Sequence, residues 1–472
     1  MNRATEFTEI TESHCKCNMV PCRNLFSVNS VISVAKRLAM NYRTFSIVVV
    51  AAALAGCGQT DPPPFRLDMP NVVAKQIAPE HQEAIANMLA AMFGTPDEPF
   101  ALPEMGLNLR KLQMAAGPVW SDEQGGKHGL YRRHCAHCHG VSGDGRGPTA
   151  GILNPYPRDY RSGVFKFKST YTAAQPTDED LTKTLHEGIP GTAMPAFALL
   201  PPDEIAALVE YVKYLSIRGQ MEMALENYVF DEGFEPDVPL DPATDPELKD
   251  IIVNDLLAGV MEGWQSTGEQ IIVPDDSAIP ADERTPQEIA ASIAAGRELF
   301  YGTKANCVKC HGPTGLGDGQ QTDFDNWSKA NKDFIDATAA LADQIKAQRA
   351  ELAELEGEDR ELVEADLKRM QKELTERRQL LDHSYVLEPR NAIPRNLRDG
   401  MYRGGRRPVD IFWRVSAGIA GTPMPASGPA SEGAQGTLTE QEIWQIVDYV
   451  HSLPFEPVSR PQQRPVNVEA VN

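Results

Sequence analysis

A five-residue motif, Cys-x-x-Cys-His, occurs twice in this chain of 472 residues, at Cys135–His139 and at Cys307–His311. A Gly-x-x-Met-Pro frame follows each copy, with Met194 in the first half and Met424 in the second. Internal repetition of this kind indicates two copies of one structural unit. The fold must therefore bring a Cys-Cys-His cluster and a distant methionine together in each half.

Cys-x-x-Cys-His is the attachment signature of covalent c-type haem. The two thiols bond to the vinyl groups of one haem, and the adjacent histidine lies beneath the iron. A methionine thioether on the other face gives six-coordinate iron that exchanges one electron with little rearrangement. We predict two haem c groups, held covalently by Cys135, Cys138, Cys307 and Cys310, with axial ligands His139, Met194, His311 and Met424.

Two other interpretations of the motif are weaker. A zinc site needs four ligands, but the two cysteine pairs lie 172 positions apart. A redox dithiol would need neither the histidine nor the Met-Pro pair. Each methionine has core packing as its alternative role, and we expect the spare histidines to be polar residues near the haem edge rather than iron ligands: His134, His137 and His186.

The repeat extends beyond the ligands. Gly143-Asp-Gly145 follows the first motif, and Gly317-Asp-Gly319 follows the second. After each methionine, apolar residues recur every three or four positions, over Asp203–Leu215 and over Glu440–Leu453. This spacing predicts an amphipathic helix packed on a core in each half.

Both halves resemble class I cytochrome c domains, over roughly residues 119–220 and 286–456. The resemblance implies an all-α fold in each half. It consists of an N-terminal helix, the haem motif, a methionine loop and a C-terminal helix that crosses the first.

The same resemblance implies further contacts of the haems. A backbone carbonyl near a proline should accept a hydrogen bond from the proximal histidine; Gly147-Pro148 fits that place in the first half, and the acceptor in the second half stays open. Trp413 resembles the family's propionate-binding aromatic residue, but Lys183 occupies the same offset in the first half. Arg158 and Arg395 are candidate propionate partners, with solvated arginines as the alternative.

The N-terminal segment resembles a bacterial lipoprotein signal. Arg43 and a short apolar run precede Leu54-Ala-Gly-Cys57, and the run is too short to span a bilayer. We expect a signal peptide over residues 40–56, lipid on Cys57 and a location on the periplasmic face of the cell envelope, where haem c attachment also takes place in the family. An uncleaved anchor is the alternative. Residues 1–39 read as a non-native or disordered leader.

The remaining plan follows from composition. We expect a tether and N-terminal extension over 57–118, a first cytochrome c domain over 119–220 and an acidic linker over 221–285. A second domain should cover 286–458, before a tail over 459–472. Helices are predicted around Pro79–Phe93 and near Pro246–Trp264.

The second half carries an insert. His311 and Met424 are 113 positions apart, against 55 for His139 and Met194. The extra residues, about 328–383, have a heptad-like apolar pattern that indicates a coiled-coil-like hairpin of two antiparallel helices turning near Gly357. Decoration of the surface, docking of a partner subunit and homodimerisation all stay open as its role.

The net charge of −21 argues against nucleic acid and anionic membrane surfaces as partners. We predict an electron carrier of the respiratory chain that serves redox partner proteins or a respiratory membrane complex and has no small-molecule substrate. It looks similar to cytochrome subunits of haem-copper oxidases and of alternative complex III. The alternatives are a dihaem redox enzyme of the peroxidase or thiosulfate dehydrogenase type, and an architectural subunit of a respiratory complex.

Overall fold

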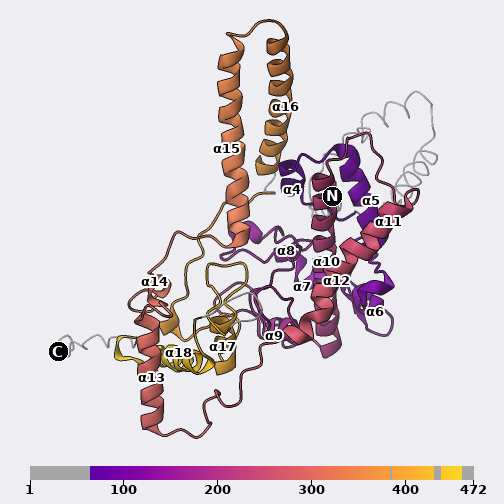
Figure 1. The fold of residues 1–472 in the computed structure, drawn as a ribbon. Helices are drawn as coiled ribbons and strands as arrows, with labels where there is room; N and C mark the ends of the chain where they lie inside the picture. Colours follow the sequence, from indigo (N-terminus) through magenta and orange to yellow (C-terminus); the bar gives the residue numbers. More distant parts are fainter. Residues whose placement is uncertain (1–63, 383–384, 430–436, 460–472) are drawn as a thin grey trace, which may run out of the picture. The chain divides into compact units, whose positions relative to one another are not determined.

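The computed structural model describes residues 64–382, 385–429 and 437–459. These residues are mostly helical, which confirms the all-α prediction (Figure 1). The one sheet among them is a pair of two-residue strands, β1 (Trp120–Ser121) and β2 (Lys127–His128), which run antiparallel. Within the described ranges, no helix has both the length and the apolar character needed to cross a membrane.

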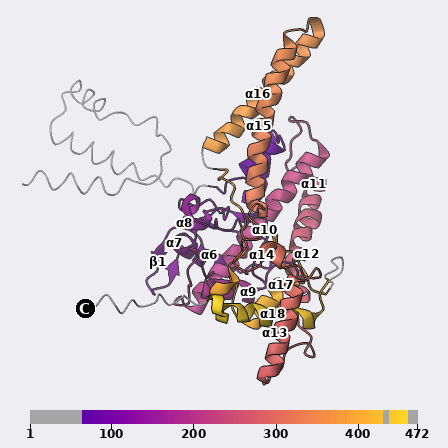
Figure 2. The ribbon, with the colours of Figure 1, turned by 90° about the vertical axis from the view of Figure 1, so that its left-hand side faces the viewer.

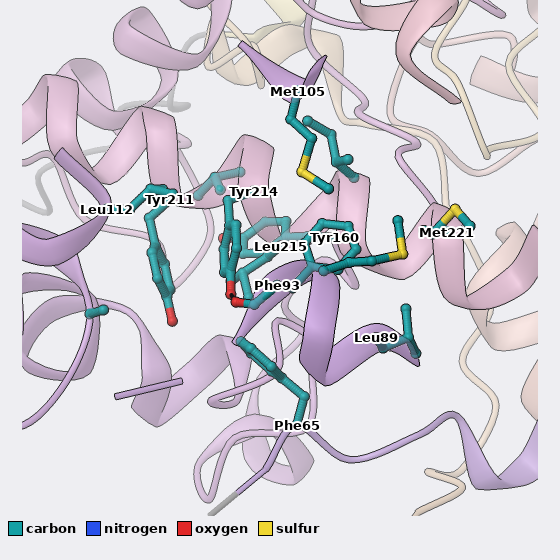
Figure 3. Close-up of a cluster of buried hydrophobic side chains, with 14 of the residues drawn as sticks. Phe65, Leu89, Phe93, Met105, Leu112, Tyr160, Tyr211, Tyr214, Leu215 and Met221 are labelled. Carbon is teal, nitrogen blue, oxygen red and sulfur yellow. Dashed lines mark hydrogen bonds between the residues drawn. The ribbon is translucent and has the colours of Figure 1, made fainter. Parts of the chain in front are cut away.

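The first half is built around α10 (Pro202–Glu232). Three other helices pack on it: α5 (Pro79–Phe93), α6 (Leu109–Ala115) and α9 (Asp178–Glu187). The helix predicted at Pro79–Phe93 is confirmed. Figure 3 shows the core that these elements enclose, where aromatic rings of α5 and α10 meet: Phe93, Tyr211 and Tyr214.

The helix predicted at Asp203–Leu215 is confirmed, but it continues to Glu232. The predicted boundary between domain and linker, at residues 220 and 221, therefore falls inside α10. The apolar face simply continues, because Met221, Leu225 and Val229 are buried in the same core.

The N-terminal helix of the predicted first domain, over 119–220, is the short α7 (Leu130–His134), which directly precedes the haem-motif helix α8 (Ala136–His139). Both α7 and α6, a helix from the N-terminal extension, pack on α10. The extension thus supplies helical packing to α10 that the short α7 alone does not.

The second half has the expected crossing of helices. α13 (Pro286–Tyr301) packs on α18 (Glu440–Ser452), and α17 (Pro408–Ser416) packs on α18 as well. Gly296 lies at the crossing, where a Cβ atom would clash with the backbone of Gln445. The haem-motif helix here is α14 (Val308–His311).

The insert forms two helices, α15 (Asn326–Leu352) and α16 (Gly357–Asp382). They lie side by side in Figures 1 and 2 and run in opposite directions, as predicted. Leu341, Ile345, Leu367 and Leu374 form the seam between them. The base of this hairpin packs on α4 (Met69–Ala74), through Phe334, Leu380 and Val386 against Val73.

The segment between the halves is also helical in part. The helix predicted near Pro246–Trp264 appears as a run of α11 (Pro246–Asp250), the π-helical η3 (Ile251–Leu257) and α12 (Ala258–Gln265). Short 3₁₀ turns complete the described elements: η1 (Pro103–Met105), η2 (Ala150–Ile152), η4 (Ser266–Gln270), η5 (Leu397–Asp399), η6 (Leu453–Phe455) and η7 (Pro457–Ser459).

Candidate haem-binding sites

The first motif folds as a single helical turn. The carbonyl of Cys135 accepts hydrogen bonds from the amides of Cys138 (3.1 Å) and His139 (2.9 Å). Gly140 then leaves the helix with φ +76°, and a Cβ atom there would clash with the carboxylate of Asp144. This turn holds the two cysteines and the histidine close together.

The second motif repeats the turn. The carbonyl of Cys307 accepts from the amides of Cys310 (3.2 Å) and His311 (2.9 Å), and Gly312 leaves the helix with φ +80°. The same local hydrogen bonds therefore position the same three side chains in both halves.

The glycines that follow correct one predicted pairing. The amide of Gly145 donates to the backbone carbonyl of His139 at 2.9 Å, and the amide of Gly317 donates to the backbone carbonyl of His311 at 2.9 Å. Gly145 and Gly317 are therefore equivalent. Pairing Gly143-Asp-Gly145 with Gly317-Asp-Gly319, as the sequence suggested, was therefore wrong. The second Gly-Asp-Gly segment lies two positions further from its haem motif than the first.

Four of the predicted ligands meet at one cavity in the first half. Cys135, Cys138, His139 and Met194 all line it. Its apolar wall comes from α9 and α10 and the loop between them: Leu181, Leu185, Phe197, Val209 and Val212. Thiols, imidazole and thioether around an apolar space form the donor set that haem c requires, so these residues fit the group.

Two of the spare histidines also line this cavity. His134 packs edge-to-face on Phe197, with ring centroids 5.8 Å apart, and burial lowers the pKa of His134. His137 is exposed. Their expected role as polar residues near the haem edge stays a prediction.

The proximal histidine of the first site, His139, is half-buried, and its ring is oriented by two neighbours. Its Nδ1 lies 3.0 Å from the carbonyl of Arg158, and its ring stacks on Tyr160 at 4.6 Å. Burial lowers the pKa of His139 to about 4, against the raising effect of the Arg158 carbonyl. With its Nδ1 directed at the Arg158 carbonyl, His139 would hold a haem iron through Nε2.

This contact corrects the predicted acceptor. The carbonyl belongs to Arg158, which follows Pro157, and not to Gly147-Pro148. Gly147 instead donates its amide to Cys138 at 3.0 Å and packs against the turn of the motif itself.

The second proximal histidine has the equivalent neighbour. Burial lowers the pKa of His311, and the carbonyl of Arg395, which follows Pro394, opposes that lowering. The Nδ1 atom of His311 stops short of full hydrogen-bond geometry with it. Arg395 nevertheless fills the acceptor position that the sequence left open.

The first methionine loop is a tight turn. The amide of Ile189 donates to the carbonyl of Met194 at 3.2 Å, and the hydroxyl of Thr192 donates to Ile189 at 2.8 Å. Gly188 has φ +67°, and a Cβ atom there would lie 2.6 Å from the carbonyl carbon of Pro195. Only glycine fits this position without strain.

The second methionine loop repeats these contacts. The amide of Ile419 donates to the backbone carbonyl of Met424 at 3.1 Å, and the hydroxyl of Thr422 donates to the carbonyl of Ile419 at 2.7 Å. Gly418 has φ +70°, and its Cβ atom would lie 2.6 Å from the carbonyl carbon of Pro425. The two loops therefore present Met194 and Met424 in the same way.

The two arginines predicted as propionate contacts lie in different surroundings. Arg158 lines the first cavity, and its Nη2 donates to the carbonyl of Ala420 at 3.3 Å. Arg395 donates through Nε to Met401 at 3.2 Å. Both stay candidates.

Trp413 does not fit its predicted role. It donates its indole N–H to the carbonyl of Ile272 at 2.9 Å. An indole has a single donor, so this contact with the linker leaves Trp413 none for a propionate.

The sequence analysis missed several polar residues that line the first cavity, among them Lys166, Asp325, Trp327 and Arg403. One signal was present, because Lys166 and Arg403 each lie three positions after a glycine that occurs at a similar place in the two halves, Gly163 and Gly400. Trp327 belongs to the inserted hairpin and has no counterpart in the first half.

Cys57, the signal peptide over 40–56 and the leader over 1–39 lie outside the described residues. Among the residues that are described, no group of three or more His, Cys, Asp or Glu side chains gathers in a way that would hold a metal ion.

A sequence model of the cytochrome c family matches residues 126–216. The match contains the first motif and Met194, and the second motif lies outside it. These residues form a cytochrome c domain, and such a domain implies a haem c group and the transfer of electrons.

No curated protein matches the sequence. Among solved structures, a chain of the reducing HAO-like protein complex of Kuenenia stuttgartiensis is similar, with 22% sequence identity. The alignment covers 71% of this chain and 97% of that one, with a TM-score of 0.38.

Proposed function

We propose that this chain carries two haem c groups and relays single electrons between redox partner proteins of a respiratory chain. The observation that carries the proposal is the repeated geometry of the two halves. The turn of the haem motif, the carbonyl after a proline beside the histidine and the methionine loop all occur twice, at equivalent positions.

A relay is favoured over an enzyme because of the ligands. His139 and Met194 would fill both axial positions of the first iron, and His311 and Met424 those of the second. An enzyme that acts on a substrate at the iron needs an open position, and none remains when both are filled.

The test is a redox titration of the full-length protein with Met194→Ala and Met424→Ala variants. Each variant should lower the reduction potential of one haem and leave the other unchanged, because thioether ligation raises the potential. The dihaem relay would be overturned if only Met194→Ala changed a potential, or if the protein contained only one haem.

We further propose that lipid on Cys57 holds the protein on the periplasmic face of the cell envelope. The support is the Leu54-Ala-Gly-Cys57 sequence after a short apolar run. Cys57→Ser should release the protein from membranes with its haem content unchanged. An intact peptide spanning residues 54–60 in the mature protein would rule the lipid anchor out.

A further inference from the structure

In each half, an arginine side chain contacts the methionine loop of the other half. The guanidinium of Arg158 lies against Ala420 and Gly421, which precede Met424. The guanidinium of Arg395 lies against Gly191, which precedes Met194. Since Arg158 and Arg395 also supply the carbonyls beside the two proximal histidines, the two candidate sites meet at one boundary within the fold.

Basic side chains are in excess at this boundary. Arg158, Lys166 and Arg403 line the first cavity together with two carboxylates, Asp159 and Asp325. Asp159 is already paired with Arg161 at 2.8 Å. Lys166 pairs with Asp325 at 2.8 Å, and Asp325 also caps α15 by accepting from the amide of Ser328.

The basic groups are incompletely compensated. Burial lowers the pKa of Lys166 and of Arg403; Arg158 lowers that of Lys166 further, and Arg395 does the same to Arg403. The three cations of the cavity wall are half-buried, and the two carboxylates beside them already pair with Lys166 and Arg161. Positive charge that is partly removed from water in this way favours a negative partner.

Two donors in the same wall are also buried without an acceptor: the indole N–H of Trp327 and the Nε of Arg403. The Trp327 ring is held in place by Tyr156, edge-to-face at 5.0 Å, and by Arg146 at 5.6 Å. A buried donor without a partner costs about 1–3 kcal/mol. A fixed indole N–H near a guanidinium whose Nε lacks an acceptor is therefore suited to an anionic oxygen.

We propose that the propionate carboxylates of the first haem bind at a site that both halves build, with Arg158 and Lys166 from the first half and Trp327 and Arg403 from the second. The proposal rests on haem c in residues 126–216, and it holds whether or not the second motif carries a haem. The haem's own carboxylates are the anions to expect, because the same cavity contains both cysteines of the first motif. The first haem site is therefore incomplete without the second half and its insert.

The experiment is a redox titration of the full-length holoprotein and of its two single variants, Trp327→Phe and Arg403→Gln. Both variants should lower the potential of the first haem, because an uncompensated propionate charge favours the oxidised, more positive iron. The second haem should change less, and Met424→Ala identifies its signal by shifting it. Arg403→Lys should restore most of the first haem's potential, which a merely structural role of Arg403 would not require.

Two matched controls use residues far from the cavity wall. Arg349→Gln changes an exposed arginine on α15, and Trp120→Phe changes an exposed tryptophan that stacks on His128. Neither should alter either potential. An unchanged first haem in both Trp327→Phe and Arg403→Gln, with normal haem content, would overturn the shared site. Loss of the second haem in the unaltered protein would instead refute the dihaem relay and leave this test intact.

Discussion

The proximal histidines and the methionine loops depend on single backbone positions. His139 is directed by one carbonyl, that of Arg158, which lies 3.0 Å from its Nδ1, and burial lowers its pKa. The methionine loops turn only because a glycine with positive φ begins each of them. Ligand identity is therefore local in the sequence, but ligand direction depends on neighbours that are not ligands.

A first prediction concerns Gly418→Ala. A methyl group at φ +70° would be strained and would also press on Pro425. We expect a loss of about 1–3 kcal/mol in stability and loss of the Met424-to-iron absorption band, with the first haem unchanged.

Gly259→Ala is the matched control. Gly259 lies in α12 with nothing within 4 Å of its Cβ position. This substitution should stabilise the protein by about 0.5–1 kcal/mol. If Gly418→Ala kept its methionine band and its stability, the glycine requirement of the loop would be wrong.

At the scale of elements, α10 holds the N-terminal extension through buried charges. Glu226 on α10 lies 3.6 Å from Lys75 and accepts from the side chain of Asn71 on α4. Burial, followed by the nearby carboxylates of Glu222 and Asp68, raises the pKa of Glu226 from 4.5 to about 8.

This raised pKa predicts a pH dependence of stability. The folded protein keeps the proton on Glu226 where the unfolded chain releases it. The contribution is fully present below pH 4.5 and is lost as the pH rises to about 8. Glu226→Gln should remove this loss and raise the free energy of unfolding at pH 8 by roughly 1–3 kcal/mol relative to the native protein.

Chemical denaturation of both proteins at pH 5 and pH 8 measures this difference. Asp336→Asn is a suitable control, because Asp336 is an exposed carboxylate on α15. Equal pH profiles for the native protein and Glu226→Gln would show that Glu226 is charged in the folded state.

The hairpin is the second element with a testable consequence. Its base is part of the fold, since Phe334 and Leu380 pack on α4 and Trp327 lines the first cavity. Its distal part packs on itself through the seam that contains Ile345 and Leu367. Replacing residues 342–370 by a short Gly/Ser loop should therefore leave both haems in place, as measured by haem content.

The truncation also separates the roles that the sequence left open. A docking arm predicts loss of association with the partner complex in a pull-down from native membranes, and homodimerisation predicts a change of mass in solution. Unchanged association and mass would leave surface decoration as the better account. Loss of a haem would contradict the division into base and distal part.

The elements show where sequence patterns succeed and where they stop. The helix predicted around Pro79–Phe93 is present with these bounds, and a proline at its start and Gly94 just after its end mark it. The continuation of α10 was missed, because residues 221–285 were interpreted as an acidic linker. Glu222 and Glu226 in this segment are buried, where Arg218 and the residues of α4 contact them.

The candidate site divides in the same way. The candidate cysteines and histidines lie in one five-residue motif, and each candidate methionine lies in a short Gly-x-x-Met-Pro frame, so all eight candidates could be named from the sequence. Trp413 was assigned wrongly because its partner, Ile272, lies 141 positions away. Trp327 and Arg403 were missed for the same reason, since they line the first cavity from the other half of the chain.

For the whole molecule, we propose two equivalent sites in one chain, each binding one haem through histidine and methionine. The geometry of the two halves repeats closely enough that both should behave alike. The second half adds Asp325, Trp327 and Arg403 to the wall of the first cavity.

EPR spectroscopy of the oxidised full-length protein, together with its haem-to-protein ratio, tests this claim most directly. The account predicts two haems per chain and two low-spin signals that are both typical of histidine–methionine ligation. One haem per chain, or a high-spin or bis-histidine signal at either site, would contradict it.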